Sequence, residues 1–168
     1  MKGGLTMAVR HKRGKYFERL PGMPAPLYIQ VKRRVMLSEV DVLGIVWHGR
    51  YAQYIEEASA ALGRKCGLSY LDYRQANLRA PIVQYHVDYY LPLKLEDEIT
   101  VRASLVWCEG ARLNTEFELT RKDSEVATAG FTVQMFLDGT TGETCLVPPE
   151  LVEKCRRRWK AGEFKCLQ

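Results

Sequence analysis

The sequence predicts an α+β fold in which an antiparallel sheet of about five strands wraps around one long helix. Three observations support this prediction. A helical pattern covers residues 48–66, a strand-like segment precedes it, and about four strand-like segments follow it in succession. Strands that follow one another after a helix are typical of an antiparallel sheet, and a long helix with a wide apolar stripe needs a surface that covers it.

The first 26 residues are predicted to form a basic N-terminal extension, and residues 27–168 a single domain. The extension contains several Lys and Arg residues and three prolines, which favour extended or turn backbone. Residues 27–37 form the first predicted strand because β-branched and aromatic side chains, such as Tyr28 and Val31, are frequent there.

Residues 48–66 follow the period of a helix rather than that of a strand. Its apolar stripe consists of residues at helical spacing, namely Tyr51, Ile55, Ala58 and Leu62. Gly67 is placed to end this helix, because glycine readily adopts the left-handed conformation common at that position. A second, shorter helix is expected over residues 70–76.

Strand-like segments then occupy most of the remaining chain. They are rich in β-branched and aromatic side chains and are separated by polar turns, and they cover residues 82–90, 99–107, 113–120 and 126–137. A short C-terminal helix is predicted to begin near Pro148, Pro149 and Glu150, because proline is tolerated in the first helical turn.

The charge of the chain is unevenly distributed. The net charge is +5, yet residues 1–34 hold nine Lys and Arg against one acid, and residues 150–168 hold six against three. The body between them is mildly acidic, which argues against nucleic acid as the main partner. The basic ends could contact a phosphorylated ligand, RNA or an acidic surface, or could be solvated tails.

The five cysteines indicate neither a disulfide framework nor a metal site, because their number is odd and no C-x-x-C pair occurs. Reduced thiols and a cytoplasmic location are therefore expected, with no metal bound. No apolar run reaches the length of a membrane-spanning helix, and the N-terminus lacks the apolar core of a secretory signal. Its basic, acid-poor composition leaves a transit peptide as an alternative.

The stretch of residues 38–54 combines an acid, an imidazole and the start of the long helix. Asp41 lies in an irregular segment, Gly44 allows a turn, and His48 comes just before the helical pattern. A helix N-terminus presents unpaired N–H groups that can polarise a carbonyl, and a carboxylate can act as base or nucleophile. From the residues alone, the simpler interpretation is that Asp41 is a turn or capping residue and His48 an N-cap, and Glu56 is the alternative catalytic acid.

Residues 41–51 read D-V-L-G-I-V-W-H-G-R-Y. This run resembles the signature D-x-x-G-[IV]-[VI]-[FYW]-[HYN]-x-x-[YF] of hotdog-fold acyl-CoA thioesterases of the 4-hydroxybenzoyl-CoA thioesterase type, close relatives of the Tol–Pal-associated thioesterases of bacteria. Later stretches agree in the same order, although Glu96 stands where the family usually has glycine. The resemblance covers residues 28–155.

The resemblance implies a hotdog fold and hydrolysis of an acyl-CoA or acyl-carrier thioester without a cofactor. It implies a homo-oligomer, dimer or tetramer, whose sheets join and whose active sites lie at the subunit interface. The catalytic aspartate corresponds to Asp41, as general base or nucleophile, and the residue whose backbone N–H polarises the thioester corresponds to His48. The residues expected to bind substrate are Gly44, Ile45, Val46, Trp47, Gly49, Tyr51 and Arg112.

Two features of the substrate stay open at this stage. The phosphates of CoA require basic residues, and the candidates, any of which could be ordinary surface charges, are Arg79, Arg112, Arg121, Lys122 and residues 156–158. The acyl group is not fixed either, because Trp47 and Tyr51 would suit an aromatic or a short acyl chain.

Two other functions are compatible with the sequence. One is hydration or dehydration of an acyl thioester, which would use His48 as base together with Asp41, although the usual hydratase motif is absent. The other is a non-catalytic acyl-CoA-binding module whose basic ends contact nucleic acid.

Overall fold

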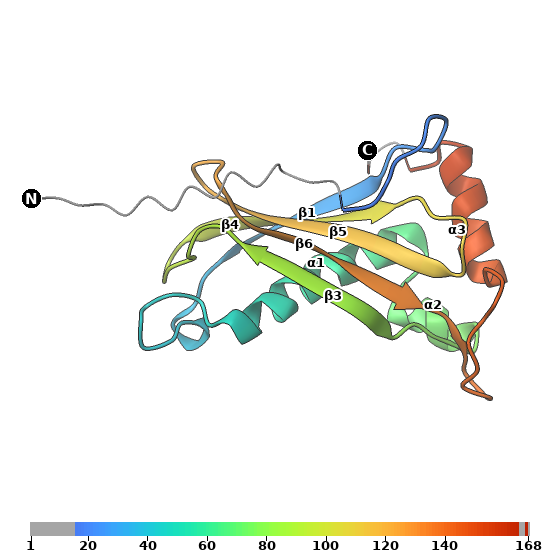
Figure 1. Cartoon of the computed structure of the whole chain (residues 1–168), viewed down its shortest axis with the longest axis horizontal. Coiled ribbons are helices and arrows are strands. Elements are labelled where there is room, and N and C mark those ends of the chain that lie inside the picture. Colours follow the sequence, from blue (N-terminus) through green and yellow to red (C-terminus); the bar gives the residue numbers. More distant parts are fainter. Residues whose placement is uncertain (1–15, 165–166, 168) are drawn as a thin grey trace, which may run out of the picture.

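The computed structural model describes residues 16–164 and residue 167. It confirms the hotdog fold predicted from the sequence, with a five-stranded antiparallel sheet on one side and a long helix lying against it (Figure 1). Residues 1–15 of the predicted basic extension lie outside the described residues. No helix in the described part of the chain is long and apolar enough to cross a membrane.

The strands of the main sheet are hydrogen-bonded in the order β1-β4-β5-β6-β3. Their bounds are Leu27–Arg34 for β1, Ile82–Tyr89 for β3, Glu98–Val106 for β4, Arg112–Arg121 for β5 and Val126–Met135 for β6. The last three strands pair with their sequence neighbours, but β3 pairs with β6 rather than with β4. As a result, β1 and β3 are the two edges of the sheet.

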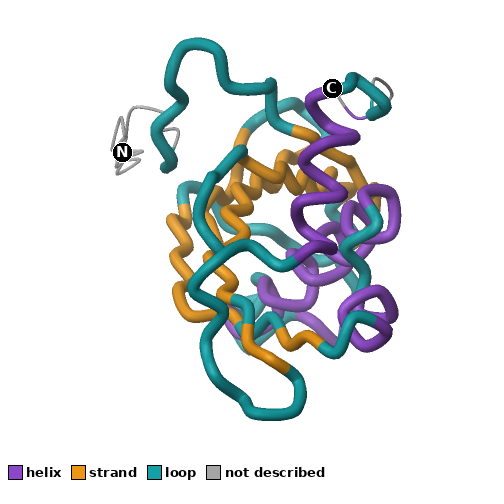
Figure 2. Tube along the Cα trace, turned by 90° about the vertical axis from the view of Figure 1, so that its right-hand side faces the viewer, coloured by secondary structure: helices purple, strands orange, loops and turns teal. Residues whose placement is uncertain are grey.

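Helix α1 (Tyr51–Cys66) lies against one face of the sheet, which we call the inner face (Figures 1 and 2). Its contacts are chiefly with β4 and β1. The residues of its predicted apolar stripe are all buried, and Gly67 ends it with φ = +74°. The helix begins three residues later than predicted, because His48–Arg50 form a separate 3-10 turn, η2.

Shorter elements complete the domain. They are the 3-10 turn η1 (Leu37–Glu39), helix α2 (Tyr70–Gln75), a ribbon of β2 (Leu78–Arg79) with β7 (Leu137–Asp138), and helix α3 (Glu150–Lys160). The ribbon was not predicted, and β1 ends three residues before the predicted position. Met36 terminates the extended segment, because its N–H binds the Glu39 carboxylate of η1 at 2.8 Å.

The outer face of the sheet, which points away from α1, is partly covered by residues 16–26. We call this segment the strap. It belongs to the predicted extension, but it packs against the domain: Glu116 of β5 accepts the N–H of Tyr16 and of Phe17 at 2.9 and 3.1 Å. At its other end, the indole N–H of Trp159 in α3 donates to the carbonyl of Ala25 at 2.9 Å.

Gly130 is required where β6 passes β3 and β5. It pairs with Val87 on one side and Phe117 on the other. A Cβ atom at position 130 would overlap the backbone oxygen of His86 and the ring of Phe117. The backbone oxygen cannot move without displacing β3, so only glycine fits here.

We therefore expect Gly130→Ala to lower the free energy of unfolding by about 1–3 kcal/mol, as overpacking of a core does. Chemical denaturation measures the change. Gly110→Ala is the matched control, because a Cβ atom there would only touch Cys108 and Arg112 at ordinary distances of 3.7 and 4.0 Å. Equal stability of Gly130→Ala and the control would contradict this packing.

Candidate functional site

The motif loop, which we define as residues 40–47, is a tight turn tied at its base by a bridge between Val40 and Val46. Asp41 donates its N–H to the carbonyl of Ile45 at 2.9 Å and accepts the N–H of Gly44 at the same distance. Gly44 has φ = +73°, so its place in the motif follows from backbone conformation. The loop therefore closes around Asp41.

The carboxylate of Asp41 is half-buried and is both a turn residue and a chemically available group. Its Oδ1 atom accepts the N–H of Leu43 at 2.8 Å, which fixes the side chain in an Asx turn. Its Oδ2 atom accepts no hydrogen bond from another described residue. The turn interpretation made from the sequence is thus correct, and it leaves one oxygen free to accept a proton.

Glu39, the residue just before the motif loop, fixes the loop to the rest of the domain. Its buried carboxylate accepts hydrogen bonds from the guanidinium of Arg33 at 2.5 Å, the hydroxyl of Tyr54 at 2.9 Å and the N–H of Met36. Its carbonyl accepts the N–H of Trp47 at 2.9 Å. Glu39 therefore links β1, α1 and the Trp47 end of the motif loop, and the sequence analysis did not identify it.

Trp47, His48 and Gly49 form the passage from the loop into the helix. The Trp47 and His48 rings lie 5.0 Å apart, and both side chains are exposed. A Cβ atom on Gly49 would overlap the indole of Trp47, so this glycine makes room for the tryptophan. The His48 imidazole makes no hydrogen bond to another described residue. The first N–H groups of a helical segment lack partners within the helix. The backbone N–H groups of His48 and Gly49, at the start of η2, are therefore available as donors.

Three more of the predicted substrate-binding residues, Ile45, Val46 and Tyr51, contact β3 or the segment that follows it. Val46 is buried and donates its N–H to the carbonyl of Leu93 at 2.8 Å, and Ile45 bridges Lys94. Tyr51 is buried at the start of α1, with its ring perpendicular to that of Tyr89 at 4.9 Å. Lys94 and Tyr89 were missed by the sequence analysis, although Tyr89 was visible as an aromatic residue in a predicted strand.

The inner face of β3 adds an aromatic wall that is open at the edge of the sheet. Tyr85 and Tyr89 are 46% and 51% exposed, although both rings contact buried aromatic residues. Burial raises the pKa of Tyr51 and Tyr89, and raises that of Tyr85 to about 12. These phenols are therefore protonated at neutral pH, so none of the three acts as a base there.

Arg112 is not brought to Asp41 within one chain. It begins β5 and donates to the sulfur of Cys108, beside α3, whereas the motif loop bridges Lys94, near the other end of β4. Strand β4, which runs between these two ends, has nine residues and is therefore about 26 Å long. Figure 1 shows the motif loop and α3 at opposite ends of the molecule.

The other basic candidates are mostly engaged in contacts of their own. Arg156 is buried and holds the carbonyls of Glu109 and Gly110, so its role is structural. The remaining ones bind nearby oxygens: Arg79 to Gly139, Arg121 to Asp123, Lys122 to Glu98, Arg157 to Glu150 and Arg158 to Glu163. Arg121 and Lys122 lie at the end of the sheet that carries the motif loop, since Arg121 pairs with Ile99.

Two further observations limit the site. Glu56, the alternative acid, is exposed on α1, where it forms a hydrogen bond with Tyr70 of α2. Among the described residues, no group of three His, Cys, Asp or Glu side chains could hold a metal ion.

The chain resembles known proteins over most of its length. Residues 35–155 match the family described as the thioesterase-like superfamily. A relative from Aquifex aeolicus, named as a provisional esterase, is 28% identical over 122 residues, which are 73% of this chain and 93% of the relative.

Solved structures from Staphylococcus aureus share the fold. The DHNA-CoA thioesterase is 20% identical, with a TM-score of 0.71 over 83% of this chain and 95% of that chain. A second protein, determined in complex with CoA, is 17% identical, with a TM-score of 0.70 over 82% and 86% of the two chains. By the family match, this chain belongs to the thioesterase-like superfamily.

Proposed function

We propose that this protein hydrolyses an acyl-CoA or acyl-carrier thioester with Asp41 as its catalytic carboxylate. The observation that carries the proposal is the position of Asp41: a closed loop holds its carboxylate just before the N-terminal turns of the central helix, with Oδ2 unoccupied among the described residues. Within the superfamily, the motif of residues 41–51 favours the 4-hydroxybenzoyl-CoA thioesterase type.

The proposed reaction uses the loop and the helix start together. The thioester carbonyl accepts a hydrogen bond from the backbone N–H of His48 or Gly49, which stabilises the oxyanion that develops during attack. In the general-base route, Asp41 takes a proton from water as the water oxygen adds to the carbonyl carbon. The carbon–sulfur bond then breaks, and the products are the free acid and the CoA thiol. Direct attack by Asp41, followed by hydrolysis of the anhydride, is the alternative route.

Pairing of two chains along β3 would complete the site. One side of this edge strand pairs with no other strand in the described part of the chain, and Ile82, Val83, Tyr85 and Tyr89 are each about half exposed. An exposed edge with apolar side chains readily pairs with another strand. In a two-fold dimer joined there, the sheets run antiparallel, so the Arg112 end of one chain approaches the Asp41 end of the other.

Substrate recognition follows from the surroundings of the loop. The structural neighbour determined with CoA supports CoA as the carrier group. Lys94, Arg121 and Lys122 lie at the Asp41 end of the sheet and are our candidates for the CoA phosphates. Trp47, Tyr51 and Tyr89 line the acyl side, where an aromatic or a short acyl group would fit.

Asp41→Asn is expected to lower kcat for acyl-CoA hydrolysis by about 10²–10⁴-fold, because it removes the proton acceptor and keeps the size of the side chain. Release of the CoA thiol from a panel of aromatic and short-chain acyl-CoAs measures the rate. The matched control is Glu56→Gln, which removes an exposed carboxylate of α1 instead of the one in the motif loop. This variant should keep wild-type turnover. A loss at Glu56 equal to that at Asp41, or an enoyl-thioester absorbance from a 3-hydroxyacyl-CoA, would contradict the proposal.

His48→Asn is expected to reduce kcat by less than about tenfold, because the proposed contribution of this residue is its backbone N–H. The same thiol-release assay, with circular dichroism to verify folding, measures the effect. If folded His48→Asn lost as much activity as Asp41→Asn, the imidazole would have a direct part in the reaction.

A further inference from the structure

The strap makes its contacts on three strands of the outer face. The rings of Tyr16 and Phe17 pack on Phe131 of β6, with centroids 5.3 and 5.2 Å apart. The Tyr16 hydroxyl donates to the carboxylate of Asp88 in β3 at 2.7 Å. The strap therefore reaches the edge strand β3 as well as the middle of the sheet.

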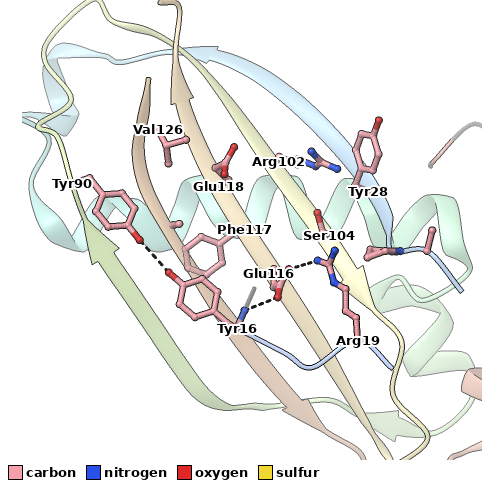
Figure 3. Close-up of a pocket in the computed structure, with 13 residues that line it drawn as sticks. Tyr16, Arg19, Tyr28, Tyr90, Arg102, Ser104, Glu116, Phe117, Glu118 and Val126 are labelled. Atoms are coloured by element: carbon pink, nitrogen blue, oxygen red, sulfur yellow. Dashed lines mark hydrogen bonds and ion pairs between the residues drawn. The ribbon is translucent and has the colours of Figure 1, made fainter. Parts of the chain in front are cut away.

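Glu116 is the main attachment point of the strap. Besides the two N–H groups of Tyr16 and Phe17, its carboxylate binds the guanidinium of Arg19 at 2.7 Å. The Glu116 side chain is only 13% exposed, whereas that of Arg19 is 31% exposed, so the ion pair is buried on the sheet side and open to water on the strap side. Figure 3 shows the strap crossing the strands at this point, with Tyr16 and Arg19 on either side of Glu116.

The strap also forms one wall of a cavity of about 370 Å³, and most of the other lining residues belong to the sheet (Figure 3). The sheet side of the lining is mixed. Tyr28, Tyr90, Phe117, Val126 and Ala129 contribute apolar surface, and Arg102, Ser104, Glu116 and Glu118 contribute polar groups. Without the strap, the apolar members of this lining and the ring of Phe131 would be uncovered on the sheet face. Open apolar patches on sheet faces promote association between molecules.

We propose that the strap occupies the outer face of the sheet and thereby limits the assembly to a dimer joined along β3. This proposal rests on the pairing described under the proposed function. In that dimer the outer faces of both chains are continuous across β3, and each Tyr16 lies beside the junction, over β3 and β6. The two straps thus cover the surface on which a second dimer would stack.

The test is the mass of the full-length protein, measured by size-exclusion chromatography with light scattering under reducing conditions. Two variants release the strap by different routes: Glu116→Ala removes its attachment point, and Tyr16→Ala with Phe17→Ala removes its aromatic contacts without altering the sheet. Glu118→Ala is the matched control, because Glu118 lies on the same face of β5 and bonds only Thr120 among the described residues. The rate of trypsin cleavage after Arg19 reports release of the strap.

The expected result is a dimer, twice 19.3 kDa, for the wild type and for Glu118→Ala. Both strap variants should be cleaved at least about tenfold faster after Arg19 and should form species heavier than a dimer. A wild type heavier than a dimer, strap variants that stay dimeric, or unchanged cleavage would overturn the proposal. A monomeric wild type would overturn the β3 pairing itself and the strap proposal with it, whereas the Asp41 chemistry is tested separately by thiol release.

Discussion

The hydrogen bonds and ion pair of the Glu39 carboxylate are the interaction on which the site depends. A buried carboxylate is costly unless it is paired and hydrogen-bonded, and Glu39 has partners from three parts of the fold: Arg33 of β1, Tyr54 of α1 and the N–H of Met36. Arg33 also binds Glu57 of α1 and lies over the Tyr54 ring. The sheet edge, the central helix and the loop that bears Asp41 are thereby fixed at one point.

The two faces of the main sheet are covered at least in part, whereas its β3 edge is open and lies beside the proposed site. Helix α1 covers the inner face of the sheet, and the strap covers part of the outer face. The edge of β3 and its aromatic wall stay exposed, next to Tyr51 and the motif loop. Because the open β3 edge and the candidate site are adjacent, pairing of two chains along β3 would form the interface and close the pocket at the same time.

Much of the fold was predictable because its elements are long enough to show a period. The stripe of α1 and the succession of strands predicted an antiparallel sheet around a long helix. The resemblance of residues 41–51 to the thioesterase signature then implied the hotdog fold and identified Asp41 as the candidate carboxylate. The ribbon of β2 and β7 is too short for any period, at two residues a strand. Glu39 and the strap were missed for another reason: their roles depend on contacts with residues distant in sequence, such as Glu116, a hundred residues from Tyr16.

The most direct test of the link between Glu39 and catalysis is a double-mutant cycle of Glu39→Gln and Asp41→Asn, measured as kcat for acyl-CoA hydrolysis by folded proteins. If Glu39 acts by positioning Asp41, Glu39→Gln lowers kcat by about tenfold in the wild type but by less than about twofold in Asp41→Asn, because residues that act as a unit are not additive. Equal fold-losses in both backgrounds would contradict this, since Glu39 would then act independently of the carboxylate it is thought to hold.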